Sequence, residues 1–295
     1  MKQQAVSLRA WAPWLVRRLS TPRAGFTLTE LLVIMGTLAL LAVIGLPSLA
    51  NSHLKSSFAV CVSNHRQLIQ SVHGFAQDNQ DALVPIDYVR PDGGRMFLTG
   101  GGFWPGPAEE IVTGMTPQQA LRAVQEGLRR GPLWQYIKAT ETFHCPGDER
   151  MLLRKPGNGW GYDSYSKSDN IGGNGGFNPA AAPFKRVVDV ADPSMSFVFC
   201  EEADPRNYNL GAWVLSVNPP SWIDTFGAFH DGGTMFSFLD GHADFNRWRD
   251  SRVLKAATAA MQGIAAFNFP GGDATNPDFR WVWDRYQYLG WKSLK

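Results

Sequence analysis

The longest apolar stretch of the chain runs from Leu31 to Leu49 and holds no charged side chain. At about 1.5 Å of rise per residue, a helix of this length reaches about 28 Å, which is close to the hydrocarbon thickness of a bilayer. The pattern therefore predicts one membrane-spanning helix. Glu30 stands directly before it, and a carboxylate drawn toward the bilayer core costs about 2.5 kcal/mol or more, so we expect Glu30 to have a partner.

An amphipathic pattern follows the apolar one. Apolar residues recur at steps of three and four from Leu54 to Phe75, which predicts that the helix continues to about Asn79 and packs one face on a folded domain. Pro85 prevents an easy continuation. Within the apolar half, Pro47 removes one intrahelical hydrogen bond, and we expect the helix to bend there.

The rest of the chain indicates a β-containing, turn-rich domain, because the sequence has 18 phenylalanines, 30 glycines and only 18% charged residues. Thr116 is a suitable N-cap and Pro117 a suitable first residue for a helix that ends near Arg130. Residues 133–137 predict a further helical turn. Residues 194–200 predict a strand buried on both faces, because apolar residues occupy consecutive positions.

The clearest local pattern is an Asp-Gly pair, Asp240–Gly241, between the alternating apolar residues of segment 234–245. Such a pair predicts a β-hairpin with a two-residue type I′ turn, which needs positive φ at both central residues. That turn places Leu239 opposite His242 and thereby sets the register of the two strands.

The charge of the chain is unevenly distributed. Lysine and arginine number 28 against 26 acidic residues, but segment 1–25 contains five basic residues and no acidic one. Without this segment, 23 basic residues face 26 acidic ones, a formal net charge of −3. The basic excess therefore indicates a positive-inside signal for a cytoplasmic leader, and it argues against a nucleic-acid-binding surface.

The segment Gly25–Glu30 resembles the prepilin signature of type IV pilins and type II secretion pseudopilins. The resemblance implies that a prepilin peptidase cuts after Gly25 and that the new amino group of Phe26 is methylated. Glu30 then becomes the fifth mature residue, which in such fibres neutralises the terminal amine of a neighbouring subunit. Two opposite charges in a low-dielectric helix bundle are tolerated when they meet, which fits this role.

An ordinary secretory signal is the alternative interpretation of the N-terminus. It would use the same basic segment and apolar run, with a small-residue cut site at residues 48–50 and a mature chain beginning at Asn51. The apolar run is longer than the roughly 7 to 15 residues of such a signal, and Glu30 stands at its start. Both features favour the prepilin interpretation.

A second resemblance lies near the C-terminus. His230 is followed by nine residues and then by Asp240–Gly241, which is similar to the H-X9-DG element of prepilin-type bacterial proteins. Segments 61–68 and 143–148 are similar to two other blocks of those proteins, although a leucine is more usual at the position of His65. The resemblance covers the anchor, the helix, the middle of the chain and the hairpin.

These patterns predict four regions: a basic leader (1–25), a transmembrane and assembly helix (26–50), an amphipathic continuation (51–80) and an extracytoplasmic globular domain (81–295). The expected fold is α+β and pilin-like. In it, a long N-terminal spine helix, half membrane-embedded and half amphipathic, packs on an antiparallel β-sheet.

The implied function is that of a non-enzymatic pilin- or pseudopilin-like subunit of a type II secretion or type IV pilus-like assembly. Its partners would be the prepilin peptidase, other pilin-like subunits and the membrane, and no nucleic acid. The chain would cross the bacterial inner membrane once, with its N-terminus in the cytoplasm and its domain outside. The alternative is an envelope-anchored protein that binds a glycan or other extracellular ligand through tryptophans, namely Trp104, Trp160, Trp213, Trp222 and Trp281.

Several residues around the hairpin are suitable metal ligands: His230, Asp240, His242 and Asp244. Pseudopilins can hold calcium in a C-terminal loop, so the resemblance suggests Ca²⁺ or another divalent ion. The competing interpretation needs no cofactor, because Asp240 is a turn-forming residue and His230 can hydrogen-bond to the hairpin.

The three cysteines follow the anchor and would lie in an oxidising compartment after export. At most one intramolecular pair can form. Cys61 and Cys145 both lie in blocks that resemble the family, so a disulfide between them is the first choice, with buried free thiols as the alternative.

An enzyme would have to use acidic residues such as Glu201, Glu202 and Asp204. The chain has no Gly-x-Ser-x-Gly elbow, no His-Glu-x-x-His helix and no phosphate-binding loop. We therefore expect no catalytic activity.

Overall fold

The computed structural model describes residues 27–86, 106–173, 175, 178–206 and 212–294, and it leaves out the side chains of residues 42–55. Two compact units divide the chain between Ala50 and Asn51. The elements of the second unit hold the candidate site.

The α-helices are α1 (Leu28–Asp78), α2 (Pro117–Arg129), α3 (Trp134–Ile137), α4 (Arg150–Leu153), α5 (Ser251–Met261) and α6 (Pro277–Arg285), and 3-10 turns cover Thr140–Phe143, Val187–Asp189 and Pro193–Met195. The strands are β1 (Tyr165–Ser168), β2 (Phe197–Glu201), β3 (Ala212–Trp213), β4 (Leu215–Val217), β5 (Pro220–Trp222), β6 (Gly233–Phe238) and β7 (Ala243–Arg247).

The main sheet has five strands in the order β3-β1-β2-β6-β7, and a separate hairpin pairs β4 with β5. Neighbouring strands are antiparallel except β1 and β3, which are parallel. The expected antiparallel sheet is therefore wrong, and the fold is α+β with a mixed sheet. Within the described residues β3 covers Ala212–Trp213, a segment too short to show a strand pattern in the sequence.

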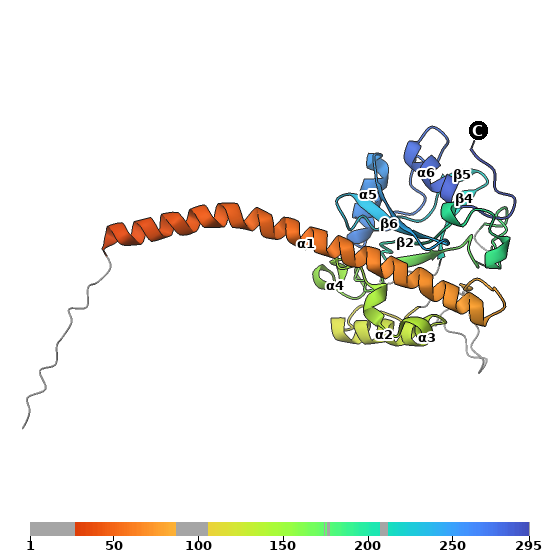
Figure 1. Cartoon of the computed structure of the whole chain (residues 1–295), viewed down its shortest axis with the longest axis horizontal. Coiled ribbons are helices and arrows are strands. Elements are labelled where there is room, and N and C mark those ends of the chain that lie inside the picture. The colour runs from red at the N-terminus through yellow and green to blue at the C-terminus, as the bar shows by residue number, and fades with distance from the viewer. Residues whose placement is uncertain (1–26, 87–105, 174, 176–177, 207–211, 295) are drawn as a thin grey trace, which may run out of the picture. The chain divides into compact units, whose positions relative to one another are not determined.

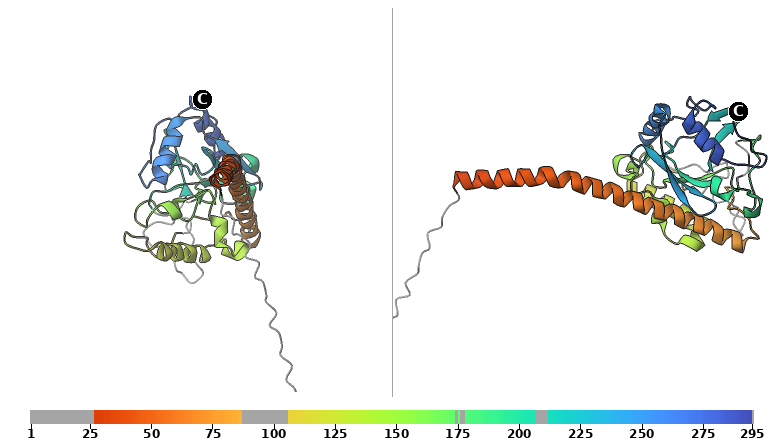
Figure 2. Two further views of the ribbon diagram at one scale, coloured as in Figure 1. Left: turned by 90° about the vertical axis from the view of Figure 1, so that its left-hand side faces the viewer. Right: turned by 45° about the horizontal axis from the view of Figure 1, so that its top comes forward.

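The sheet is covered on both faces, as Figures 1 and 2 show. On one face, residues 56–78 of α1 pack together with α2 and the loop after it, in a core that includes Leu68, Val124 and Phe199. On the other face, α5, α6 and the β4-β5 hairpin pack on aromatic residues such as Phe236 and Trp213. Burial on both faces explains why β2 and β6 lack the alternation of a half-exposed strand.

The prediction of a spine helix with a membrane-embedded half is also wrong. Among the residues that the structure describes, no helix is long and apolar enough to cross a membrane. The sequence-based expectation rested on the uncharged run 31–49, of which the side chains from residue 42 onward lie outside the description.

Local sequence chemistry predicts α2 correctly. Thr116 has extended backbone angles and its hydroxyl accepts a hydrogen bond from the Gln119 amide, while the Gln119 side chain accepts from the Thr116 amide. This capping box satisfies two amides that the helix leaves unpaired, and Pro117 occupies the first turn. The helical turn at 133–137 is confirmed as α3, and the buried strand at 194–200 as β2.

The hairpin between β6 and β7 exists, but its predicted register is wrong by one residue. Ser237 pairs with Ala243, and the Phe238 amide donates to the His242 carbonyl, so the loop has three residues, 239–241. The Gly241 amide donates to the Phe238 carbonyl, and Gly241 has φ of +100°. This is the three-residue hairpin loop in which a glycine with positive φ follows a type I turn.

Replacement of Gly241 by alanine should lower the free energy of unfolding by about 1 kcal/mol, because an L-residue is strained at positive φ. Space is available for the added methyl group, since its nearest neighbour is a side-chain atom of Ile69 at 3.9 Å. Urea unfolding of Gly241→Ala and Gly241→Asn provides the measurement. Asparagine tolerates this conformation better and should recover part of the loss; equal stability of the alanine variant and the wild type would contradict the assignment.

Candidate metal centre

Four donor side chains from distant parts of the sequence meet between α1 and the main sheet. They are Cys61 on α1, Cys145 in the turn after the 3-10 segment Thr140–Phe143, Glu201 at the end of β2, and His230 before β6. One donor atom from each lies within 4.8 Å of all the others, and all four residues are buried. This group could hold a metal ion.

Two of the four donors, Glu201 and His230, are positioned by irregular backbone. The register of β2 against β6 shifts between Phe197 and Phe199, and this bulge turns Glu201 toward α1 while Cys200 faces the opposite core. His230 precedes a tight turn at Asp231–Gly232, whose φ values of +44° and +72° are those of a type I′ turn. The Gly233 amide closes this turn by donating to the His230 carbonyl.

The donor atoms converge on one point. Cys145 Sγ lies 3.0 Å from His230 Nε2, and Glu201 Oε1 lies 3.3 Å from the same nitrogen. The Cys61 thiol donates to Glu201 Oε1 at 3.1 Å. In a cysteine hydrolase the thiol and the orienting acid would bind opposite nitrogens of the imidazole, whereas here both approach Nε2. The arrangement therefore does not form a nucleophile–base–acid relay.

Neighbouring groups fix the donors in place. The Tyr165 hydroxyl donates to Cys61 Sγ at 3.5 Å, and the Gly147 amide donates to Cys145 Sγ at 3.4 Å. The second oxygen of Glu201 accepts from the Met235 amide at 2.8 Å. The ring of Phe58 lies edge-on to the imidazole of His230, with 5.5 Å between ring centroids. Each of the four donors is therefore oriented by a further contact.

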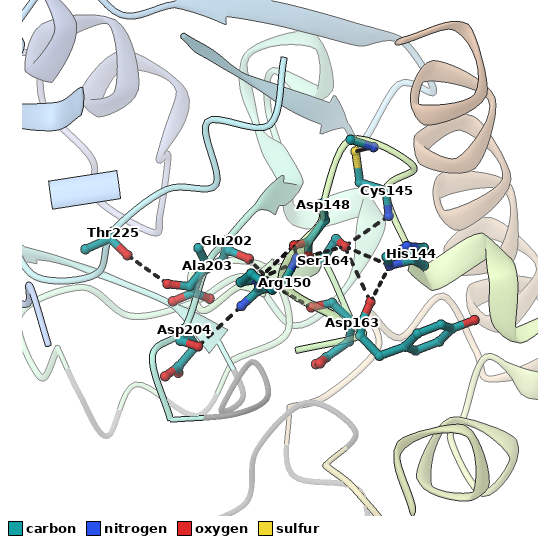
Figure 3. Close-up of polar contacts among 12 residues, drawn as sticks. His144, Cys145, Asp148, Arg150, Asp163, Ser164, Glu202, Ala203, Asp204 and Thr225 are labelled. Carbon is teal, nitrogen blue, oxygen red and sulfur yellow. Dashed lines mark hydrogen bonds and ion pairs between the residues drawn. The ribbon is translucent and has the colours of Figure 1, made fainter. Parts of the chain in front are cut away.

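A buried polar network holds the Cys145 backbone, as Figure 3 shows. The Cys145 amide donates to the Ser164 hydroxyl, which donates to Asp148 at 2.8 Å. Asp148 in turn makes a two-pronged ion pair with Arg150, at 2.9 and 2.7 Å. The position of one candidate ligand thus depends on a salt bridge outside the site.

Burial and mutual contacts set the protonation of the group. Burial raises the pKa of Cys61 to about 11 and that of Cys145 well above its usual value, so both remain neutral thiols without a metal. Burial by itself would lower the pKa of His230, but the contacts with Cys145 and Glu201 outweigh it and raise the pKa to about 10. A neutral thiol is a poor nucleophile, so these shifts do not indicate a catalytic cysteine.

Of the predicted metal ligands, the structure brings only His230 into this group. Asp240 and His242 form an exposed pair at the hairpin turn, with His242 Nδ1 2.6 Å from Asp240 Oδ1. Asp244 is exposed on β7, where one of its oxygens accepts from the Phe245 amide. Within the described residues, the donors that gather around one point are the two thiols, the carboxylate and the imidazole.

The proposed disulfide partners, Cys61 and Cys145, are neighbours here as buried free thiols, and Cys200 is also a buried free thiol. The acidic residues considered for an enzyme do not form one group, because Glu201 faces α1, whereas Asp204 forms an ion pair with Arg206.

The N-terminal positions are described only in part. Gly25 and Phe26 lie outside the described residues, and Pro47 lies within α1. Glu30 is exposed in the first turn of α1, where its carboxylate accepts from the Thr27 amide at 2.8 Å.

Sequence reasoning selected His230 as a metal ligand and Cys61 and Cys145 as disulfide partners, and it missed Glu201 as their neighbour. The available signal was the occurrence of both cysteines and the histidine in blocks that resemble one family. Comparison of the chain with models of protein families, with curated proteins and with solved structures gives no match. The candidate centre therefore rests on its own geometry.

Proposed function

We propose that the chain is a non-enzymatic subunit of a pilin- or pseudopilin-like assembly, cut by a prepilin peptidase between Gly25 and Phe26. The observation that carries this proposal is an apolar helical surface that the described residues of its own unit leave exposed. The large apolar side chains of the first turns of α1 are exposed there: Leu28, Leu31, Leu32, Val33, Ile34, Met35, Leu38, Leu40 and Leu41. Other copies of the same helix are partners of matching chemistry for such a surface.

Glu30 is the acidic residue on this surface. Its carboxylate accepts hydrogen bonds from both the amide and the hydroxyl of Thr27, and its own amide donates to the Thr27 hydroxyl. These contacts hold the negative charge at the N-terminal end of the helix, where it is stabilised by the helix dipole. After cleavage, the amino group of Phe26 lies one residue before Thr27, so each subunit carries both members of the charge pair that the assembly requires.

The glycan-binding alternative has less support. Trp160, Trp213 and Trp222 are fully buried, so they cannot stack on a sugar. Trp281 packs partly buried against Phe236, and Trp104 lies outside the described residues.

The expected Ca²⁺ cofactor also has less support than another divalent ion. Ca²⁺ takes six to eight oxygen ligands, and the buried group offers one carboxylate, two thiols and an imidazole. The proposed assembly does not depend on an ion at that position.

Replacement of Glu30 by alanine should leave cleavage intact but reduce assembly at least about tenfold, because truncating one partner of a desolvated charge pair costs about 2 kcal/mol or more. The full chain is expressed in a bacterium that has a prepilin peptidase, and the sedimentable fraction and the mature N-terminus are measured. Glu110→Ala, at an exposed position outside the helix, is the matched control. A mature chain that begins at Asn51, or normal assembly of Glu30→Ala, would rule out the proposed function.

A further inference from the structure

We infer that Cys61, Cys145, Glu201 and His230 bind one Zn²⁺ ion in a tetrahedral site that ties α1 to the sheet. The inference concerns the unit 51–295 and is independent of assembly through the first turns of α1. It rests on the convergence of four buried donor atoms on one point.

The donor separations fit a small tetrahedral ion. With metal–sulfur bonds of about 2.3 Å and metal–nitrogen or metal–oxygen bonds of about 2.0 Å, neighbouring donors of such an ion lie about 3.3 to 3.8 Å apart. The separations here are 3.0 Å between Cys145 Sγ and His230 Nε2, 3.3 Å between His230 Nε2 and Glu201 Oε1, and 3.1 Å between Glu201 Oε1 and Cys61 Sγ. Outward shifts of about half an ångström would admit the ion.

The chemistry of the donors selects the metal. Two sulfurs, one nitrogen and one oxygen suit Zn²⁺, whereas Ca²⁺ and Mg²⁺ require oxygen ligands in larger number. Four protein ligands close the coordination sphere, which is the arrangement of structural zinc rather than of catalytic zinc with an open position. Binding replaces the two thiol protons and any proton on His230 Nε2 by the ion, and these protons pass to solvent.

The surroundings provide the outer contacts that a zinc site needs. Amide and hydroxyl donors from Gly147 and Tyr165 point at the two sulfurs, and the Met235 amide holds the second oxygen of Glu201. Such contacts orient ligands and stabilise thiolate charge. A surface cavity is lined by Gly147 and by Phe229, the residue before His230, so two segments that carry ligands also border solvent.

The four ligands come from α1, a loop, β2 and the turn before β6, so one ion cross-links segments that are up to 169 residues apart in sequence, from Cys61 to His230. Because the unfolded chain has no such preformed site, binding stabilises the folded state. We expect the domain to unfold at a higher temperature with Zn²⁺ than after its removal.

The test measures metal binding by the full-length chain, purified with its thiols reduced. Wild-type protein should retain one Zn²⁺ per chain, and Co²⁺ in its place should give the visible absorption of tetrahedral cobalt bound to thiolate. Cys145→Ala and Glu201→Gln should weaken Zn²⁺ binding by more than the roughly 100-fold that loss of an outer contact can cost. Glu201→Gln keeps the shape of the side chain, so a loss of binding in that variant does not depend on misfolding.

Cys200→Ala is the matched control, because Cys200 is equally buried but faces the opposite core. It should bind Zn²⁺ as wild type does. Absence of Zn²⁺ and Co²⁺ binding by folded wild-type protein with three reduced thiols would overturn the inference. So would undiminished binding by Cys145→Ala, or a Cys61–Cys145 disulfide in protein isolated from its host.

Discussion

Replacement of Arg150 by methionine should lower the free energy of unfolding by about 3 to 5 kcal/mol, the largest loss that we expect from a single side chain outside the metal centre. Arg150 and Asp148 are both almost fully buried, and their ion pair is two-pronged. The guanidinium also donates to three backbone carbonyls, those of Asp163, Glu202 and Asp204. Methionine fills similar space but leaves the Asp148 carboxylate without its counter-charge.

Urea unfolding of the variant at neutral pH measures this loss. Arg186→Met is the matched control, because Arg186 pairs with Asp189 on the surface and its removal should cost less than about 1 kcal/mol. In the Arg150→Met background, Asp148→Asn should recover part of the stability, since it removes the uncompensated charge. Equal effects of the two arginine substitutions would show that the buried pair contributes no more than a surface pair.

Replacement of Lys167 by methionine should stabilise the protein by about 2 kcal/mol at pH 6 and lose this advantage at about pH 8 to 9. Lys167 is fully buried in β1, and burial lowers its pKa to about 7, although Asp169 opposes the shift. Its amino group donates to the carbonyls of Ser168 and Ile171, and those contacts are lost in the variant. The charge of nearby Lys185 adds to the lowering of the pKa.

The direction of the pH dependence follows from proton binding. Between about pH 7 and the usual lysine value of 10.5, the unfolded chain binds a proton at Lys167 that the folded chain does not. The contribution of this residue to the free energy of unfolding therefore rises by about 1.4 kcal/mol per pH unit across that window, and below it the full cost of a buried charge remains.

The stability difference between variant and wild type isolates Lys167 from other titrating groups. In metal-free protein, His230, whose pKa is raised, loses its stabilising proton as the pH rises through the same window, but it does so in both proteins. Unfolding at pH 6, 7, 8 and 9 gives the measurement, and Lys255→Met on the exposed face of α5 is the control. A stability difference that stays constant with pH would contradict a neutral Lys167.

Elements that depend on neighbouring residues were predictable from the sequence. Thr116 and Gln119 define the start of α2 by their own hydrogen bonds, and an Asp-Gly pair indicates the hairpin. The hairpin register was not predictable from that pair, because two- and three-residue loops both accept a glycine with positive φ. Packing of Met235 and Phe245 toward α1 selects the three-residue loop.

The candidate metal centre could not be predicted from local sequence patterns, for a different reason. Cys61 and Glu201 are 140 residues apart, and no spacing rule connects them. Glu201 was considered only together with Glu202 and Asp204, although strand alternation sends the adjacent side chains of Glu201 and Glu202 to opposite faces. The sheet order and the bulge in β2 had to be known before the four donors could be grouped.

That bulge also determines the kind of ligand that the strand presents. In a regular strand continuing in phase from Phe197, which faces the α5–α6 side, Cys200 would turn toward α1 and Glu201 away from it. The extra residue reverses this choice and substitutes a hard oxygen for a third soft sulfur. Two sequences that differ only in the phase of this strand would therefore differ in metal preference. An insertion or deletion before Cys200 would exchange Glu201 and Cys200 at the site without a substitution at either position.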